Sequence, residues 1–174
     1  MTAWFVLLAV VVAERLAELF LSNRHTGWSR KRGGVEHGAA HYPLMVALHT
    51  LFLVGCAVEP LLFARPFVPE LGWVCLAVAL ACQALRWWCI MTLGERWNTR
   101  VIVVPGLAPV VAGPYRYFRH PNYVAVVGEG LALPLIHSAW LTAAVFTVLN
   151  ASLLVVRIRV EDAALGRDAS DVRP

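Results

Sequence analysis

Long apolar runs separated by short polar breaks dominate the chain. A helix needs about 20 apolar residues to cross a bilayer core, where only internal hydrogen bonds can satisfy the backbone. Three runs meet this requirement: Thr2–Leu21, Tyr42–Phe63 and Leu71–Leu93. The pattern therefore predicts a transmembrane helix over each of these runs.

The pattern changes after the third run. Residues 94–122 form a polar stretch punctuated by Pro and Gly, and loops of this length inside a compact chain are usually functional. Pro121–Ile136 is then a short apolar run, barely long enough to span at about 1.5 Å per residue. After a tight turn at 137–138, Ala139–Val156 is apolar again. These last two runs predict a short helical hairpin.

The composition agrees with a membrane protein. Hydrophobic residues occupy 59% of the 174 positions, charged residues occupy only 15%, and the mean hydropathy is +0.65. Soluble domains are about half apolar and a quarter charged. The length suits one domain, and no linker divides the chain. We predict an all-α integral membrane protein, a single domain over residues 1–174, with five transmembrane helices of which the last two form the hairpin.

The basic residues beside each run predict the orientation. Most lie in the first connection, the polar stretch and the tail: Arg24, Arg30, Lys31, Arg32, Arg96, Arg100, Arg116, Arg119, Arg157, Arg159 and Arg167. The opposite side has only Arg65. The positive-inside rule then places the N-terminus outside and the C-terminus in the cytoplasm. The excess of Arg over Lys and the many Ala and Val residues hint at a GC-rich bacterial genome, so we expect a multi-pass protein of the bacterial cytoplasmic membrane.

Three other interpretations are disfavoured. The net charge is +4, but the basic residues form no continuous stripe, so no nucleic-acid partner is expected. Cys56, Cys75, Cys82 and Cys89 lack paired-thiol spacing, so we expect neither a metal nor a disulfide framework. No basic segment precedes the first apolar run, which is therefore expected to remain as a helix and not to be removed as a signal peptide.

Residues 113–123 concentrate aromatic and basic side chains, including Tyr115, His120 and Tyr123. Pro121 is expected to open a helix with His120 at its cap, because proline is tolerated at the first helical position. The free N–H groups of that helix end favour an anion, such as the carboxylate of an amino-acid cofactor. The alternative interpretation is an interfacial aromatic belt with snorkelling arginines.

Other charged residues lie within or just beyond the apolar runs. Arg157 and Glu161 are four residues apart and share one helix face; the alternative is a positive-inside arginine followed by a solvated acid. Glu129 lies well inside the fourth run, where an unpaired charge is costly. Asn150 in the fifth run is a candidate partner for Glu129, and Arg86 is a candidate for simple snorkelling.

These motifs together resemble the isoprenylcysteine carboxyl methyltransferase family over residues 86–165. The matching residues are Gly113-Pro114-Tyr115, then Arg119-His120-Pro121-Asn122-Tyr123, then Arg157, Glu161 and Leu165. The resemblance implies S-adenosylmethionine as the cofactor. The cofactor contacts that it implies are Arg100, Leu107, Ala108, Pro109, Val110, Tyr115, His120, Pro121, Asn122, Tyr123 and Glu161. At Leu107 the contact is limited to the backbone or to apolar packing.

The resemblance also makes Arg157 the substrate-facing residue, and Glu129 is a further candidate for substrate binding. We predict catalytic roles for Arg157, Glu161 and His120. Arg157 would hold an acidic oxygen nucleophile through charge-assisted hydrogen bonds. His120 or Glu161 would accept the proton if that nucleophile is a phenol.

The N-terminal half resembles the bacterial branch of the family at Glu14–Leu19, at Gly34–Gly38 with His41-Tyr42-Pro43, and at Leu93–Arg100. Some members of this branch are implicated in methylating phenolic lipids. We therefore predict an S-adenosylmethionine-dependent O-methyltransferase whose acceptor is lipophilic, either a phenolic lipid or an isoprenylcysteine-type carboxylate. Its partners would be this small-molecule or lipidated substrate and membrane lipids. The alternatives are a phospholipid N-methyltransferase, a thiol S-methyltransferase, or a non-catalytic membrane binding protein.

Overall fold

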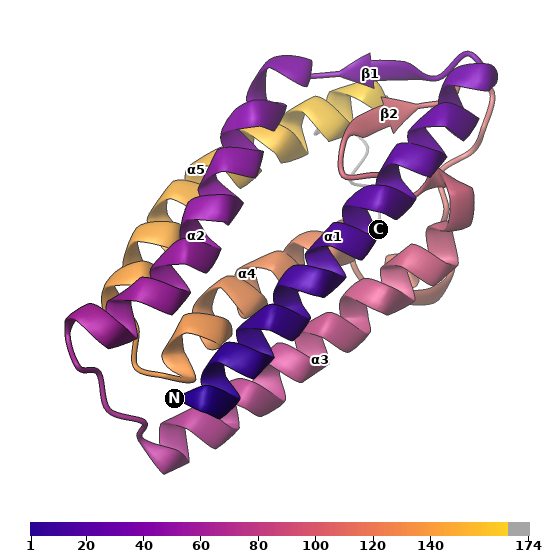
Figure 1. Cartoon of the computed structure of the whole chain (residues 1–174). Helices are drawn as coiled ribbons and strands as arrows, with labels where there is room; N and C mark the ends of the chain where they lie inside the picture. Colours follow the sequence, from indigo (N-terminus) through magenta and orange to yellow (C-terminus); the bar gives the residue numbers. More distant parts are fainter. Residues whose placement is uncertain (167–174) are drawn as a thin grey trace.

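The computed structural model describes residues 1–166, and Arg167 of the basic tail lies outside them. Its five α-helices are α1 (Thr2–Lys31), α2 (Tyr42–Leu62), α3 (Pro69–Leu93), α4 (Pro121–Leu135) and α5 (Trp140–Ala164). Helix α4 packs against both α3 and α5, and α5 also packs against α2 (Figure 1). The mostly helical fold and the closing α4–α5 hairpin confirm the pattern of the last two apolar runs.

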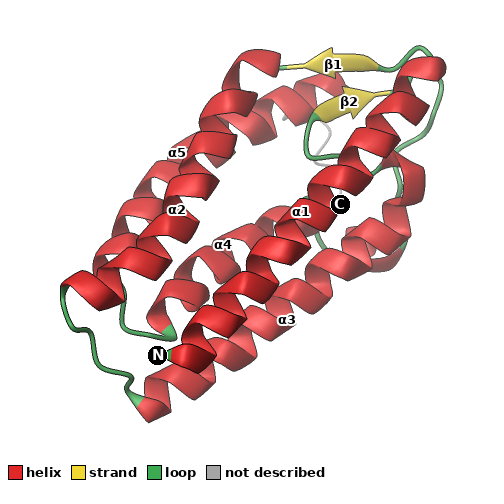
Figure 2. Cartoon of the chain, in the orientation of Figure 1, coloured by secondary structure: helices red, strands yellow, loops and turns green. Residues whose placement is uncertain are grey.

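A short two-stranded ribbon closes one end of the bundle, which the all-helical prediction did not include. Strands β1 (Val35–His37) and β2 (Val101–Val103) are antiparallel, with Glu36 opposite Ile102. Figure 2 shows the ribbon beside the ends of α1 and α5. It joins the α1–α2 connection to the long polar stretch, which also contains the 3-10 turns Gly94–Arg96 and Gly113–Arg116.

Helix α1 is longer than its apolar run, so the expected end at Leu21 is wrong. The helix continues to Lys31, and Ser22 and His25 in this extension are buried. Their side chains bond to the polar stretch: Ser22 Oγ donates to Asn98 Oδ1 at 2.7 Å, and His25 Nδ1 lies 2.8 Å from the carbonyl oxygen of Trp97. Protein polar groups therefore cover this part of the helix where hydropathy alone predicted a break.

Three helical segments are long and apolar enough to cross a membrane: Ala39–Leu62, Pro69–Arg96 and Trp140–Ala164. Helix α4 has only 15 residues, about 22 Å at 1.5 Å per residue, and α1 carries Glu14, Arg15 and Glu18 in its middle. The protein is thus an integral membrane protein by its apolar helices, while the count of five spans and the orientation of the termini stay predictions.

The apolar core fills the half of the bundle away from the ribbon. Its buried residues are Trp4, Leu8, Val11, Leu48, Phe52, Cys56, Cys75, Ala132, Leu133, Ile136 and Phe146. They come from all five helices. Trp4 Nε1 donates a hydrogen bond to the Cys56 carbonyl oxygen at 3.2 Å, which ties the start of α1 to α2. Burial of these side chains stabilises the packing of the helices, and the same helices extend to the ribbon end of the bundle.

Glu59 of α2 caps the N-terminus of α5. Its carboxylate accepts hydrogen bonds from the backbone N–H groups of Leu141 and Thr142, at 3.1 and 2.7 Å, and from Thr142 Oγ1. Arg65 adds an ion pair at 3.2 Å. A buried carboxylate is suited to this position because the first N–H groups of a helix have no partner within the helix.

We expect Glu59→Ala to lower the free energy of unfolding by about 2–3 kcal/mol, because it leaves buried donors and Arg65 without their acceptor. Chemical unfolding in detergent micelles measures the change. Glu70→Ala is the control, since Glu70 is exposed at the start of α3. Equal stability of the two variants would contradict the capping role.

Candidate active site

A cavity of about 170 Å³ lies at the ribbon end of the bundle. Its walls come from the polar stretch, from β2, from the start of α4 and from the end of α5. Eleven of the predicted site residues line it: Arg100, Leu107, Ala108, Pro109, Val110, Tyr115, His120, Asn122, Tyr123, Arg157 and Glu161. The structure therefore brings together the two halves of the motif set, which are far apart in sequence.

Two predicted site residues, Pro121 and Glu129, do not line the cavity. Pro121 is buried as the first residue of α4, with His120 as the N-cap, which confirms the expected helix start. Glu129 lies further along α4 and does not line this cavity. Its role in substrate binding stays a prediction.

Arg157 is buried at the cavity wall, and its guanidinium group reaches three other segments. Nε donates to the hydroxyl of Tyr123 at 2.8 Å, and Nη2 donates to the carbonyl oxygen of Thr99. Nη1 lies 2.9 Å from the thioether sulfur of Met45 on α2. A guanidinium has five N–H donors in a planar fork, so these contacts fix its plane and leave donors for a ligand.

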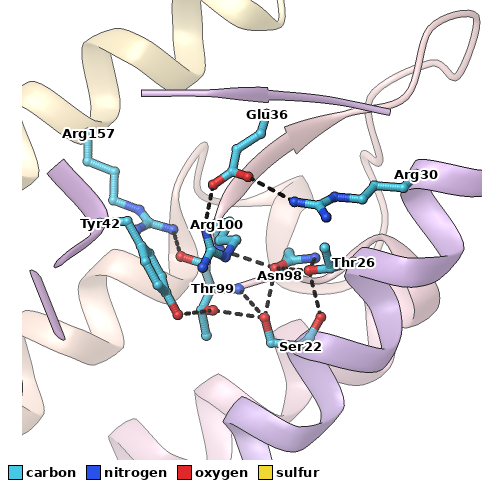
Figure 3. Close-up of polar contacts among 9 residues, drawn as sticks. All are labelled: Ser22, Thr26, Arg30, Glu36, Tyr42, Asn98, Thr99, Arg100 and Arg157. Carbon is cyan, nitrogen blue, oxygen red and sulfur yellow. Dashed lines mark hydrogen bonds and ion pairs between the residues drawn. The ribbon is translucent and has the colours of Figure 1, made fainter. Parts of the chain in front are cut away.

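Thr99 is held in place by α1 and α2. Its backbone N–H donates to Ser22 Oγ at 3.0 Å, and its own hydroxyl lies 2.8 Å from Ser22 Oγ and 3.3 Å from the Tyr42 hydroxyl. Figure 3 shows Thr99 between these two residues and Arg157. The polar extension of α1 thus determines where the carbonyl group that orients Arg157 lies. Sequence reasoning missed Thr99 because it contributes a backbone atom.

Arg100 lines the cavity and is anchored to the ribbon. Its Nη1 donates to Glu36 Oε1 at 2.6 Å, and Arg30 of α1 also pairs with Glu36 at 3.5 Å (Figure 3). The guanidinium lies over the ring of Tyr42, 4.0 Å from its centroid. The position of Arg100 therefore depends on β1 and on the start of α2, both in the N-terminal half.

Tyr123, Glu161 and His120 form a connected group on α4 and α5. The Tyr123 hydroxyl donates to Glu161, and His120 stacks on the Tyr123 ring with centroids 5.3 Å apart. His120 Nδ1 lies 3.6 Å from a Glu161 oxygen, and Nε2 lies 3.1 Å from Asp162 Oδ1. The carboxylate of Glu161, with that of Asp162, raises the pKa of His120 above its usual value, although burial opposes this shift.

Asp162 was not singled out from the sequence. Its position directly after Glu161 was the available signal, since a second acid beside a site residue can reach the same histidine. The surroundings of Tyr115 also affect its ionisation, because burial raises the pKa of its phenol. Tyr115 is therefore a neutral hydrogen-bonding group at physiological pH.

One polar atom of the site has no partner among residues 1–166. The side-chain oxygen of Asn122 is buried without a hydrogen bond, and Asn122 lines the cavity in the first turn of α4. A buried carbonyl oxygen is costly to leave unsatisfied. Together with Glu161 it offers acceptors for the amino and hydroxyl groups of a polar ligand, while Leu107, Pro109 and Val110 supply apolar contact.

A second polar cluster lies deeper in the bundle. Arg86 of α3 donates to Glu129, Arg15 is 3.5 Å from Glu129, and Arg15 pairs with Glu18 at 2.9 Å. Arg86, Glu18 and Glu129 are buried. Glu129 is thus partnered by arginines of α1 and α3 and not by Asn150, and Arg86 is not a snorkelling residue. Helix α4 packs on α3 as well as on α5, which the hairpin pattern could not predict.

Comparison with known proteins agrees with the motif set. Residues 73–167 match the model of the isoprenylcysteine carboxyl methyltransferase family. The chain is 39% identical to YpbQ, an uncharacterised protein of Bacillus subtilis, over 93% of this chain and 96% of that protein. It is also 26% identical to an uncharacterised protein of Haemophilus influenzae, over 90% of this chain and 91% of that protein.

We expect Glu129→Leu to lower the free energy of unfolding by about 3–5 kcal/mol, because Arg15 and Arg86 are then left with the single carboxylate of Glu18. The double variant Arg86→Leu/Glu129→Leu should recover much of this loss. It removes one positive and one negative charge, and the remaining buried charges of Arg15 and Glu18 pair with each other. Unfolding in micelles measures both variants. Equal losses in the single and double variants would refute this pairing.

We also expect His120 to stay protonated at pH values above about 6.5, the ordinary pKa of histidine. The stability that this proton confers is complete below about pH 6.5 and is lost as the pH rises through the raised pKa of His120. Asp162→Asn should lower the pKa of His120. Titration of histidine-labelled protein by NMR, with the resonance assigned from His120→Gln, measures the shift, and an unchanged midpoint would exclude Asp162 as a cause.

Proposed function

The chain belongs to the isoprenylcysteine carboxyl methyltransferase family, and we propose that it is an S-adenosylmethionine-dependent O-methyltransferase of a lipophilic acceptor. Family membership makes it a membrane methyltransferase. The observation that supports the finer proposal is that Arg157 and Glu161 line one cavity together with residues 107–110 and the start of α4. This cavity combines a fixed cation, a carboxylate and apolar walls.

The lining residues fit the cofactor. Glu161 and the unpartnered Asn122 oxygen would accept hydrogen bonds from its amino and hydroxyl groups. The N-terminus of α4, which no side chain of its N-cap residue caps, would favour its carboxylate, and Leu107, Pro109 and Val110 would pack on its apolar surface. When bound, S-adenosylmethionine supplies a methyl group on a positively charged sulfur, and transfer requires alignment of the acceptor more than covalent help from the protein.

Arg157 would orient the acceptor. Its buried cation favours an anionic oxygen, such as a carboxylate or a phenolate, and repels an ammonium group. This charge supports O-methylation over N-methylation of a phospholipid. His120 is suited to receive or hold a proton at the same wall, because it contacts two carboxylates and stacks on Tyr123.

We expect purified protein supplied with methyl-tritiated cofactor to label an organic-extractable lipid. Arg157→Ala and Glu161→Ala should each lower kcat/KM by at least about a hundredfold, because each removes a charged group at the reacting centre. Arg159→Ala is the matched control, since Arg159 is exposed two residues away. Unfolding temperatures of all variants establish that the fold is intact.

The acceptor panel separates the remaining alternatives. Pentadecylresorcinol tests a phenolic lipid, S-farnesylcysteine a prenylated carboxylate, and dodecanethiol a thiol, with the product identified by mass. Full activity in both the Arg157 and Glu161 variants would remove the site assignment. No labelling, together with no heat on titration with S-adenosylhomocysteine, would support a non-catalytic membrane binding protein instead.

A further inference from the structure

One of the three contacts of Arg157 is chemically weak. Nε and Nη2 donate to oxygen atoms, of Tyr123 and Thr99, whereas Nη1 faces the thioether sulfur of Met45. A thioether is a weak hydrogen-bond acceptor. A buried cation gains most from strong acceptors, so the Nη1 position is the one at which an incoming oxygen improves the contacts of Arg157.

Met45 contacts Arg157 from α2, a helix that does not line the cavity. It belongs to α2, within the apolar segment Ala39–Leu62, and is not among the residues that line the cavity. Glu161 and Asn122 do line it. Arg157 therefore contacts both the polar cavity and an apolar helix that is long enough to cross a membrane.

The Met45 side chain is suited to move. Methionine is unbranched and has three rotatable bonds, and Met45 is only partly buried. A glutamate or glutamine at this position would instead give Arg157 a permanent strong acceptor and would close the position to a ligand.

We propose that Met45 occupies the position of the acceptor oxygen: a carboxylate or phenolate of a lipophilic molecule displaces its thioether from Arg157 Nη1. Met45 is then a residue that determines acceptor access, and it does not take part in the chemistry. This inference rests on the proposed function for the identity of the ligand as a methyl acceptor. The binding itself can be measured without turnover.

The experiment compares two substitutions of similar size. Met45→Gln places a strong acceptor against Arg157, and Met45→Leu places none. Met91→Gln is the control, because Met91 is exposed on α3. Binding of radiolabelled palmitic acid and of pentadecylphenol to detergent-solubilised protein saturated with S-adenosylhomocysteine is measured by equilibrium dialysis.

Met45→Gln should weaken binding of the probes by at least about tenfold, because the ligand must displace a hydrogen bond to a charged group. Met45→Leu should bind as tightly as the wild type or more tightly, and Met91→Gln should match the wild type. The affinity for S-adenosylhomocysteine should not change in any variant. In transfer assays Met45→Gln should raise KM for the acceptor with little effect on kcat.

Equal affinity of Met45→Gln and Met45→Leu overturns the assignment, and so does loss of probe binding in Met45→Leu or absence of binding to the wild type. The proposed function can fail separately. If the protein binds the probes in this Met45-dependent way but transfers no methyl group to any lipid, the inference about Met45 stands and the proposed methyltransferase reaction is refuted.

Discussion

The guanidinium group of Arg157 cannot give up its charge, so its position requires partners wherever the chain buries it. Those partners come from three segments that are distant in sequence: Met45 on α2, Thr99 in the polar stretch and Tyr123 on α4. Each must lie at a set place for the group to be satisfied. Two of these segments, the polar stretch and the start of α4, line the cavity together with the end of α5, so the contacts of Arg157 also fix part of the cavity wall.

The contacts of Arg157 also depend on the N-terminal half of the chain. Thr99 can present its carbonyl group to Arg157 because its N–H and hydroxyl groups are bonded to Ser22. The extension of α1 past its apolar run brings Ser22 to the polar stretch, and the ribbon residue Glu36 pairs with Arg100, the neighbour of Thr99. Residues 1–72, which precede the family match, thus act on the site by holding the loop that contains Thr99 and Arg100.

Hydropathy and the chemistry of Pro121 were enough to predict the five helical runs and the start of α4, because both signals depend on local sequence. The ordered motifs predicted eleven of the side chains that line the cavity, although Pro121 of the same motifs does not line it. Three-residue strands carry no periodic signal, so the ribbon could not be predicted. Thr99 acts through a backbone carbonyl group and Met45 through a thioether, and residue type marks neither as a site residue. The partner of Glu129 required knowing that α4 packs on α3.

The deeper charged cluster has a bearing on the site although it contains none of the cavity residues. Apolar packing alone sets the relative depth of helices poorly in a bilayer, because lipid tails are as apolar as the side chains that they replace. Ion pairs between Glu129 of α4, Arg86 of α3 and Arg15 of α1 do have a defined register. Tyr123 precedes Glu129 by six residues, about 9 Å along the helix. Sliding α4 to another depth would break the buried pairs and would also withdraw Tyr123 from Arg157 and Glu161. Charges with no part in the proposed chemistry therefore set the depth at which that chemistry can take place.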